Sequence, residues 1–324
     1  MKCHHKPTSP ILCTIYAFSL ATAFVANLYI LVPKEISTLP RTSLRQIKWR
    51  VFSVIVTFSI ALATYPYIFY ECADGHGYFS ISTIVKMTNV HKTTLTPLIH
   101  VIILYFGSFV TSLLQMKLAY MKIESRRTST SAPTPTQSLF ILRQISQIAR
   151  RPFSNPWQAS RDLLIAPLAE EIIFRVCIIT PFLYSGKIGI GGICWIAPLF
   201  FGLAHFHHAI QKLKGGAKWQ HVCFETLFQF TYTTLFGAYA SYCFIKFGSL
   251  VDIVLLHTFC NFMGLPNVSV IFGSPSMKDY RDLQKTLESC RLISIAAYVL
   301  GIFAFIMGFR HSVGLFPVGI GALI

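Results

Sequence analysis

The sequence predicts an all-α, polytopic integral membrane protein with about eight transmembrane helices. Hydrophobic residues make up 53% of the 324 residues, charged residues only 12%, and the mean hydropathy is +0.57. Soluble domains carry roughly 25% charged residues. The apolar residues gather in runs near or above the roughly 18 to 20 residues that cross a bilayer as a helix. Because a lipid-facing backbone must satisfy its own hydrogen bonds, these runs are expected to be helical.

Eight apolar runs carry this prediction in chain order, and together they predict a single transmembrane domain over residues 1–324. The seventh run is short, and the others approach or reach spanning length. The runs cover residues 11–32, 51–70, 98–120, 163–182, 188–206, 222–245, 250–264 and 292–309.

The first run could be mistaken for a cleaved signal peptide. Lys2 and Lys6 precede it, and Ala21-Thr22-Ala23 resembles a cleavage site. Its length of about 22 apolar residues exceeds the roughly 7 to 15 of a signal core. We therefore interpret it as a spanning helix.

Basic residues are gathered in alternate loops, which explains the net charge of +16 without nucleic acid. The loop over residues 71–97 has only Lys86 and Lys92. The positive-inside rule then places the first and third loops in the cytosol and the N-terminus in the lumen. Lys212, Lys214 and Lys218 fit the same alternation. The basic residues of the first and third loops are Lys34, Arg41, Arg45, Lys48, Arg50, and Lys122, Arg126, Arg127, Arg143, Arg150, Arg151, Arg161.

The third loop contains a low-complexity segment, residues 128–138, followed by apolar residues at helical spacing. We expect a flexible linker and then a short amphipathic helix, either on the anionic cytosolic leaflet or packed on the protein. Six of the nine cysteines lie in apolar runs without CxxC spacing, and we expect them to be small buried hydrophobes. They predict neither a disulfide framework nor a structural zinc site. These are Cys13, Cys177, Cys194, Cys223, Cys243 and Cys260.

The fourth run contains three ionisable residues in the stretch LAEEIIFRV, residues 168–176. Each costs at least roughly 2.5 to 3.5 kcal/mol at the centre of a membrane helix, so such residues are candidates for function. Glu171 and Arg175 are four residues apart, which predicts an ion pair on one helix face. Glu170 is turned about 100° away and has no partner on this helix. We therefore expect Glu170 to take part in the chemical reaction, and Glu171 and Arg175 to have supporting roles.

The stretch FGLAHFHH at the end of the fifth run supplies a second candidate. Phe201 and His205 are four residues apart and share a helix face. We expect His205 to face inward. A histidine at a helix end is more often a surface or packing residue, which is our expectation for His207 and His208.

The stretch LLHTFCNFMG in the seventh run places His257 and Asn261 on one helix face, where both can donate to the same point. Together with the carboxylate, these residues suit hydrolysis of a carbonyl compound. Glu170 would take a proton from water, and His205 would position and shuttle it. His257 and Asn261 would stabilise the oxyanion, a contribution of about 2.7 to 4 kcal/mol per donor.

Three motifs resemble those of the type II CAAX prenyl endopeptidases, the Ras converting enzymes. The family pattern is E-E-x-x-x-R, then F-x-x-x-H, then H-x-x-x-N. The stretches APLAEEIIFR, PLFFGLAHFHH, FQFTYTTLFGAYA and LLHTFCNFMGLP look like its eukaryotic branch, so the resemblance covers about residues 163–266. The matching residues stand in the family's order: Glu170, Glu171, Arg175, Phe201, His205, His257 and Asn261.

The resemblance implies an intramembrane glutamate protease of the endoplasmic reticulum membrane. Such an enzyme removes the last three residues of prenylated CaaX proteins, including Ras-like small GTPases, from the cytosolic side and within reach of membrane lipids. It assigns water activation to Glu170 and His205 and oxyanion stabilisation to His257 and Asn261. Residues 163–266 would then be the catalytic core, between N-terminal helices with a cytosolic loop (1–162) and a C-terminal loop and helix (267–324).

Other classes of membrane protein remain open or are disfavoured by the sequence. A zinc protease could use Glu170, His205 and His257 as ligands, but H-E-x-x-H is absent, and we expect no cofactor. The eleven histidines are too few and too scattered for a di-iron hydroxylase. G-x-S-G and G-x-G-D, expected in rhomboid and aspartyl intramembrane proteases, are also absent. A transporter lined by these charges is the non-enzymatic alternative.

Overall fold

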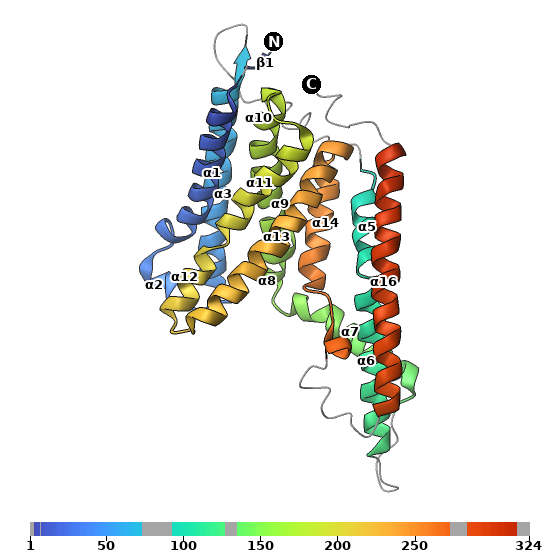
Figure 1. Cartoon of the computed structure of the whole chain (residues 1–324). Helices are drawn as coiled ribbons and strands as arrows, with labels where there is room; N and C mark the ends of the chain where they lie inside the picture. Colours follow the sequence, from blue (N-terminus) through green and yellow to red (C-terminus); the bar gives the residue numbers. More distant parts are fainter. Residues whose placement is uncertain (1–2, 7, 73–92, 127–134, 273–283, 316–324) are drawn as a thin grey trace. The chain divides into compact units, whose positions relative to one another are not determined.

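The computed structural model describes residues 3–6, 8–72, 93–126, 135–272 and 284–315 (Figure 1). This part of the chain is almost entirely helical. The exceptions among regular elements are two three-residue strands, β1 (Cys3–His5) and β2 (Tyr70–Cys72), which pair antiparallel with Cys3 opposite Cys72. The predicted all-α polytopic class is confirmed.

The chain divides into two compact units, each described by itself. The first contains Met1–Pro97, Ser160–Thr258 and Phe316–Ile324, and the second contains Leu98–Ala159 and Phe259–Leu315. The single domain that the sequence predicts therefore stays a prediction. Helices of the first unit are α1 (Pro10–Ile30), α2 (Lys34–Ser37), α3 (Leu44–Phe69), η2 (Arg161–Ile165), α9 (Ala166–Glu171), η3 (Ile172–Cys177), α10 (Ile178–Ser185), α11 (Ile190–Ala204), α12 (His207–Lys214), α13 (Trp219–Phe247) and most of α14 (Leu250–Met263).

All eight predicted apolar runs are helical in the structure. Among the described residues, four helices are long and apolar enough to cross a membrane, and a fifth span results if α5 (Thr96–Leu104) and α6 (Phe106–Ser125) count together. This pair is bent by 44° at Tyr105, where the sequence predicts one straight run. The count of eight crossings stays a prediction.

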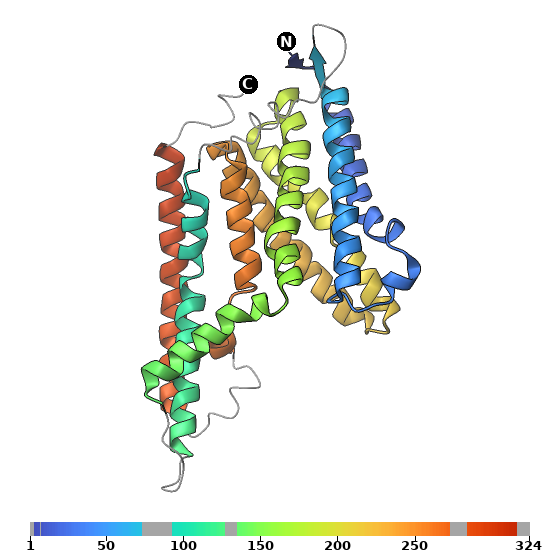
Figure 2. The same cartoon turned by 180° about the vertical axis from the view of Figure 1, so that it is seen from behind.

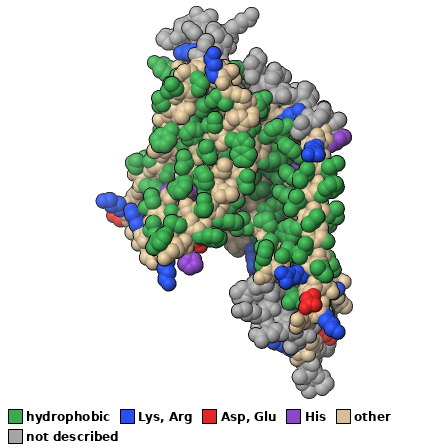
Figure 3. Space-filling model, in the orientation of Figure 1, with side chains coloured by type: hydrophobic (Ala, Val, Ile, Leu, Met, Phe, Trp, Pro, Cys, Tyr) green, Lys and Arg blue, Asp and Glu red, His purple; other side chains and the backbone are tan. Residues whose placement is uncertain are grey.

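The long helices expose apolar side chains along one face. On α1, Ile11, Ile15 and Phe18 are 71%, 58% and 59% exposed, whereas Ala17 and Leu20 are buried on the other side. Hydrophobic side chains also cover most of the visible helix flanks in Figure 3. A helix that is apolar on all sides is typical of a membrane span, because lipid solvates the face that protein does not cover.

In the first unit, α11 lies against α13, and α1 lies beside α3 (Figures 1 and 2). Two glycines bring α11 and α13 close together. A Cβ on Gly237 would lie 2.7 Å from Cβ of Pro198, and one on Gly202 would lie 2.8 Å from the Phe230 ring. Both separations are too short for real side-chain atoms. The close packing fixes α11, whose last turn leads to His205.

Asp252 on α14 is a buried charge that the sequence analysis did not identify. Its carboxylate accepts hydrogen bonds from the backbone N–H of Thr94 (3.0 Å), the Thr94 hydroxyl (2.9 Å) and the N–H of Leu95 (3.2 Å). Leu95 has a positive φ of 56°. These three donors compensate the buried charge and fix the chain ahead of α5.

The second unit is built on α6 lying beside α16 (Gln284–Leu315). A Cβ on Gly107 would clash with the Tyr298 ring, and one on Gly301 would lie 3.0 Å from the carbonyl oxygen of Ile103, so small residues set this close approach. The remaining elements of this part of the chain are α7 (Gln137–Arg150), η1 (Arg151–Ser154), α8 (Pro156–Ser160), α15 (Ser269–Phe272) and the last turn of α14.

Several predicted boundaries are corrected by the structure. The predicted loop 266–291 contains α15, and α16 begins eight residues before the predicted run, at Gln284. Cys223 is exposed rather than buried. The predicted amphipathic helix is present as α7, whereas residues 128–134 of the predicted linker and 73–92 of the second loop lie outside the described residues.

Candidate active site

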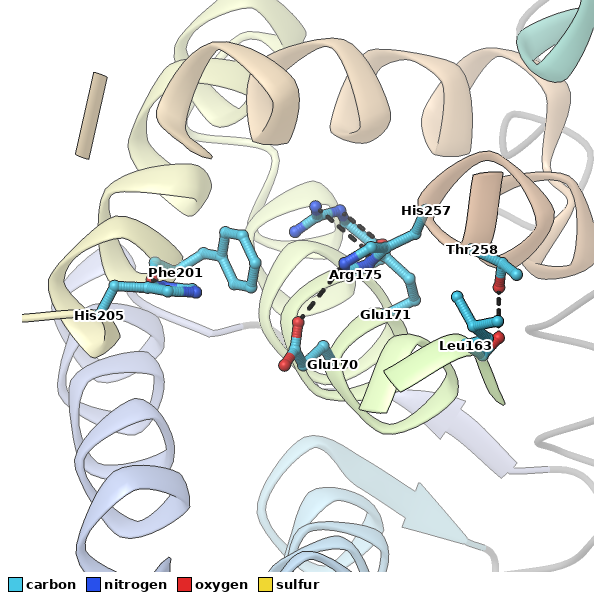
Figure 4. Close-up of polar contacts among 8 residues, drawn as sticks. All are labelled: Leu163, Glu170, Glu171, Arg175, Phe201, His205, His257 and Thr258. Atoms are coloured by element: carbon cyan, nitrogen blue, oxygen red, sulfur yellow. Dashed lines mark hydrogen bonds and ion pairs between the residues drawn. The ribbon is translucent and has the colours of Figure 1, made fainter. Parts of the chain in front are cut away.

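The two glutamates lie on a helix whose hydrogen-bond pattern changes on both sides of them. The short α-helix α9 stands between two π-helical turns, η2 and η3. Pro167 has no N–H, so the carbonyl of Leu163 lacks its helical donor. The Thr258 hydroxyl on α14 donates to this carbonyl oxygen at 2.8 Å (Figure 4). This bond joins the glutamate helix to α14 one residue after His257.

Glu171 and Arg175 form the predicted ion pair. Both side chains are 0% exposed, and Nε of Arg175 lies 3.0 Å from Oε2 of Glu171. That approach lacks hydrogen-bond geometry, and the hydrogen bond of the pair is a long one from Nη2 to Oε1, at 3.5 Å. The guanidinium also lies over the Phe201 ring, 5.6 Å from its centroid.

His257 bridges the two glutamates. Nδ1 lies 2.7 Å from Oε1 of Glu171, and Nε2 lies 3.7 Å from Oε2 of Glu170 (Figure 4). Glu171 is fully buried, whereas 20% of the Glu170 side chain is exposed. A carboxylate that accepts from Nδ1 fixes the orientation of the ring and leaves Nε2 facing Glu170. The sequence predicted neither contact, because they join residues 86 and 87 positions apart.

His205 is held at the C-terminal end of α11 by its own helix. Nδ1 lies 2.8 Å from the carbonyl oxygen of Phe201. Since a carbonyl oxygen can only accept, Nδ1 carries the proton, and Nε2 of the neutral ring is an acceptor. The Phe201 ring contacts both histidines, with centroids 4.8 Å from His205 and 6.3 Å from His257. The four-residue spacing of Phe201 and His205 therefore determines which ring nitrogen of His205 carries the proton, as well as where the ring lies.

A cavity of about 250 Å³ connects these residues within the first unit. Glu170, Phe201 and His205 line it, between α1, α3, the glutamate helix and α11. His207 and His208 also line it. His207 packs edge-on against the Tyr29 ring, with centroids 5.8 Å apart, and the expectation that both histidines are surface or packing residues stays a prediction.

Asn261 lies on α14, one helical turn after His257. The first unit ends at Thr258, between these two residues. Their common helix face agrees with the sequence pattern, and their action on one reacting atom stays a prediction.

A zinc ion in a catalytic site requires three protein ligands. Among the described residues, no group of three or more His, Cys, Asp and Glu side chains is arranged to hold a metal ion. The zinc set of Glu170, His205 and His257 therefore does not fit this geometry.

The sequence analysis missed three arginines that line the cavity, Arg41, Arg50 and Arg161. Arg161 forms a bidentate pair with Asp162, at 2.6 and 3.0 Å. The available signal was their place in the basic loops, where Arg50 and Arg161 lie just before apolar runs. It was interpreted as membrane orientation, and nothing in a single sequence shows that two distant loops meet at one cavity.

Comparison with known proteins gives a consistent result. Residues 152–263 match the family model described as type II CAAX prenyl endopeptidase Rce1-like. The human protein named CAAX prenyl protease 2 is 30% identical over 293 residues, which cover 89% of this chain and 77% of the human one. Probable CAAX prenyl protease 2 of Schizosaccharomyces pombe is 40% identical over 34% of this chain and 41% of its own. CAAX prenyl protease 2 of Rattus norvegicus is 28% identical over 80% and 70%. No solved structure matches the chain.

Proposed function

The chain belongs to the type II CAAX prenyl endopeptidase family, and we propose that it releases the C-terminal aaX tripeptide from prenylated CaaX proteins through water activated by Glu170 and His205. It is a multi-pass membrane enzyme of the CAAX prenyl protease class. Ras-like small GTPases as substrates, the endoplasmic reticulum membrane as location and access from the cytosolic side are parts of this proposal.

One observation carries the proposal: Glu170 and His205, from two separate helices, line one cavity, and His257 on a third helix lies 3.7 Å from Glu170. A hydrolytic site needs a base and a charge-stabilising donor within reach of one carbonyl group. In a transporter, ionisable residues would instead be spread along a path that crosses the membrane. The convergence therefore favours an enzyme over a transporter.

Glu170 is the proposed general base. Of the two glutamates, Glu170 lines the cavity, whereas Glu171 is buried and contacts Arg175 and His257. The acceptor Nε2 of His205 is suited to hold the other hydrogen of the attacking water. Water placed between these two groups can then attack the carbonyl carbon of the bond after the prenylated cysteine.

His257 and Asn261 are the proposed oxyanion donors. Nδ1–H of His257 donates to Glu171, so Nε2 can donate to an oxyanion when the ring carries both protons. Two carboxylates and one guanidinium surround the ring, and an imidazolium brings the formal charge of this group to zero. Asn261, one turn further along the helix, would supply a neutral second donor.

An apolar groove beside the cavity supports a lipidated substrate. It has a volume of about 350 Å³ and lies between α1 and α11. Val25, Ala204 and His207 line both the groove and the catalytic cavity, so the two adjoin each other. A prenyl chain can lie in the groove while its cysteine enters the cavity.

The proposed mechanism uses no metal ion, which a direct measurement tests. Purified protein is dialysed against a strong chelator, and its metal content and rate are measured together. A rate that survives complete removal of zinc supports the glutamate mechanism. Loss of activity on chelation with recovery on adding zinc would contradict it.

The function is tested with membranes that contain the protein and a farnesylated CaaX peptide. We expect release of the tripeptide by the wild-type chain and none by Glu170→Ala present at equal amount. If wild-type membranes and control membranes release equal amounts of tripeptide, the proposed function is wrong.

A further inference from the structure

Three guanidinium groups line the catalytic cavity together with Glu170. Arg41 precedes α3, Arg50 lies in its second turn, and Arg161 begins η2. Asp162 is the one acidic side chain among the cavity-lining residues besides Glu170. The arginines therefore outnumber the carboxylates in the lining of the cavity.

Arg161 has a positioning role. Its bidentate pair with Asp162 neutralises its charge, and its Nη1 donates to the backbone carbonyl oxygen of Arg41 at 3.0 Å. This last bond joins residues 120 positions apart and fixes the chain at Arg41 beside the cavity. Arg161 therefore orients a second arginine while its own charge is compensated.

Arg41 and Arg50 carry the uncompensated charge. Neither side chain forms an ion pair with a carboxylate in the part of the chain that the structure describes. Nε of Arg50 is buried and has no hydrogen-bond partner among these residues. Buried polar atoms in native proteins nearly always have a protein or water partner, so an unpaired guanidinium donor beside a cavity is available to a bound anion.

We propose that Arg41 and Arg50 bind the free C-terminal carboxylate of the CaaX substrate. This inference rests on the proposed function and adds to it the feature that selects the cleaved bond. A planar guanidinium recognises a carboxylate through two parallel hydrogen bonds, which fix direction as well as position.

The length of the leaving fragment sets a geometric requirement for this assignment. Three extended residues cover about 10 Å, so a carboxylate held by Arg41 and Arg50 places the bond three residues upstream about that far away. Glu170 and His205 line the same cavity as Arg41 and Arg50. By holding the terminal carboxylate, the arginines would determine which peptide bond lies beside Glu170 and His205. This explains why the released fragment always has three residues.

A second, more open hollow shares Arg41 and His208 with the catalytic cavity, and it is lined by Arg41, His208, Gln211, Lys212 and Gln229. These side chains are polar or basic, in contrast to the apolar groove on the α1 side. The hollow would give the released tripeptide, a zwitterion with an ammonium and a carboxylate at its ends, a route out that the prenyl chain does not share.

The test compares two farnesylated peptides that differ only at the C-terminus, one with a free carboxylate and one with a carboxamide. For the wild-type protein in neutral phosphatidylcholine vesicles, we expect the amide to lower kcat/KM by about 10-fold to 100-fold, because a charge-assisted pair is lost. Arg50→Gln should lower kcat/KM for the acid by a similar factor and leave the amide rate nearly unchanged. Arg45→Gln, an exposed change in the same basic stretch, is the matched control and should preserve the preference for the acid.

The possible outcomes separate this inference from the proposed function. Equal wild-type rates for acid and amide would refute the carboxylate site while leaving the protease assignment intact. No cleavage of either peptide would refute the function itself. If Arg50→Gln slows both peptides equally, and anionic lipid changes that effect, the arginines bind lipid phosphate instead and the inference is wrong.

Discussion

Removing the charge of Arg175 tests whether the buried ion pair holds the catalytic helix together. The change Arg175→Met keeps most of the side-chain volume but removes the guanidinium beside Glu171, which is 0% exposed and keeps its contact with His257. Breaking a buried pair from one side costs about 3 to 5 kcal/mol, and we expect the lower end of this range because His257 remains beside the carboxylate. Adding Glu171→Gln removes that charge, and a volume-conserving exchange typically costs less than about 1.5 kcal/mol. Most of the lost stability should therefore return.

Activity should respond differently from stability in this series. Glu171→Gln also removes the carboxylate that orients His257 through Nδ1, at 2.7 Å. The double variant should therefore be folded but slow. Stability is measured by denaturant titration in mixed micelles, and Arg45→Ala, an exposed arginine, is the control with an expected effect within about 0.5 kcal/mol. A single Arg175→Met variant as stable as the wild type would refute the reasoning.

Three further predictions concern α14 and its surroundings. Thr258→Val removes the hydroxyl that donates to the carbonyl of Leu163, so we expect the free energy of unfolding to fall by about 1 to 3 kcal/mol and kcat to decrease. The control is Thr231→Val, at an exposed threonine on α13. Asn261→Ala should lower kcat about 100-fold to 1000-fold with little change in KM, and a normal rate per folded molecule would remove Asn261 from the site. Asn267 in the sequon Asn-Val-Ser should carry no glycan in cells, because alternation from the cytosolic first and third loops places the loop after the seventh run in the cytosol; a mass shift removed by glycosidase would contradict the predicted topology.

The helices and the ion pair could be predicted because they depend on local spacing. Runs of apolar residues specify membrane helices through backbone hydrogen bonding, and all eight runs proved helical. Residues four apart on a helix are neighbours, so Glu171 and Arg175 follow from the sequence. The three motifs also predicted Glu170, His205 and His257 at one centre; the structure places Glu170 3.7 Å from His257 and in the same cavity lining as His205, and their joint action stays a prediction.

What could not be predicted depends on packing between distant segments. The bend at Tyr105 occurs without proline, and the Gly107-Ser108 pair that follows it is compatible with a kink but does not specify one. His257 contacts both glutamates because α14 is joined to the glutamate helix through Thr258 and Leu163, a bond between residues 95 positions apart. The positions of Arg41 and Arg50 at the cavity also depend on packing between distant segments. A basic loop becomes part of a site only when the helices around it have packed together.

The central claim is that Glu170 performs chemistry and is not required for binding. The most direct measurement combines single-turnover cleavage and equilibrium binding of a fluorescent farnesylated CaaX peptide by wild-type protein and by Glu170→Gln, which keeps the shape of the side chain and removes its base. We predict undetectable cleavage by the variant with a dissociation constant within about threefold of the wild-type value, because the change leaves the lipid groove intact. Substantial cleavage by correctly folded Glu170→Gln would contradict the account.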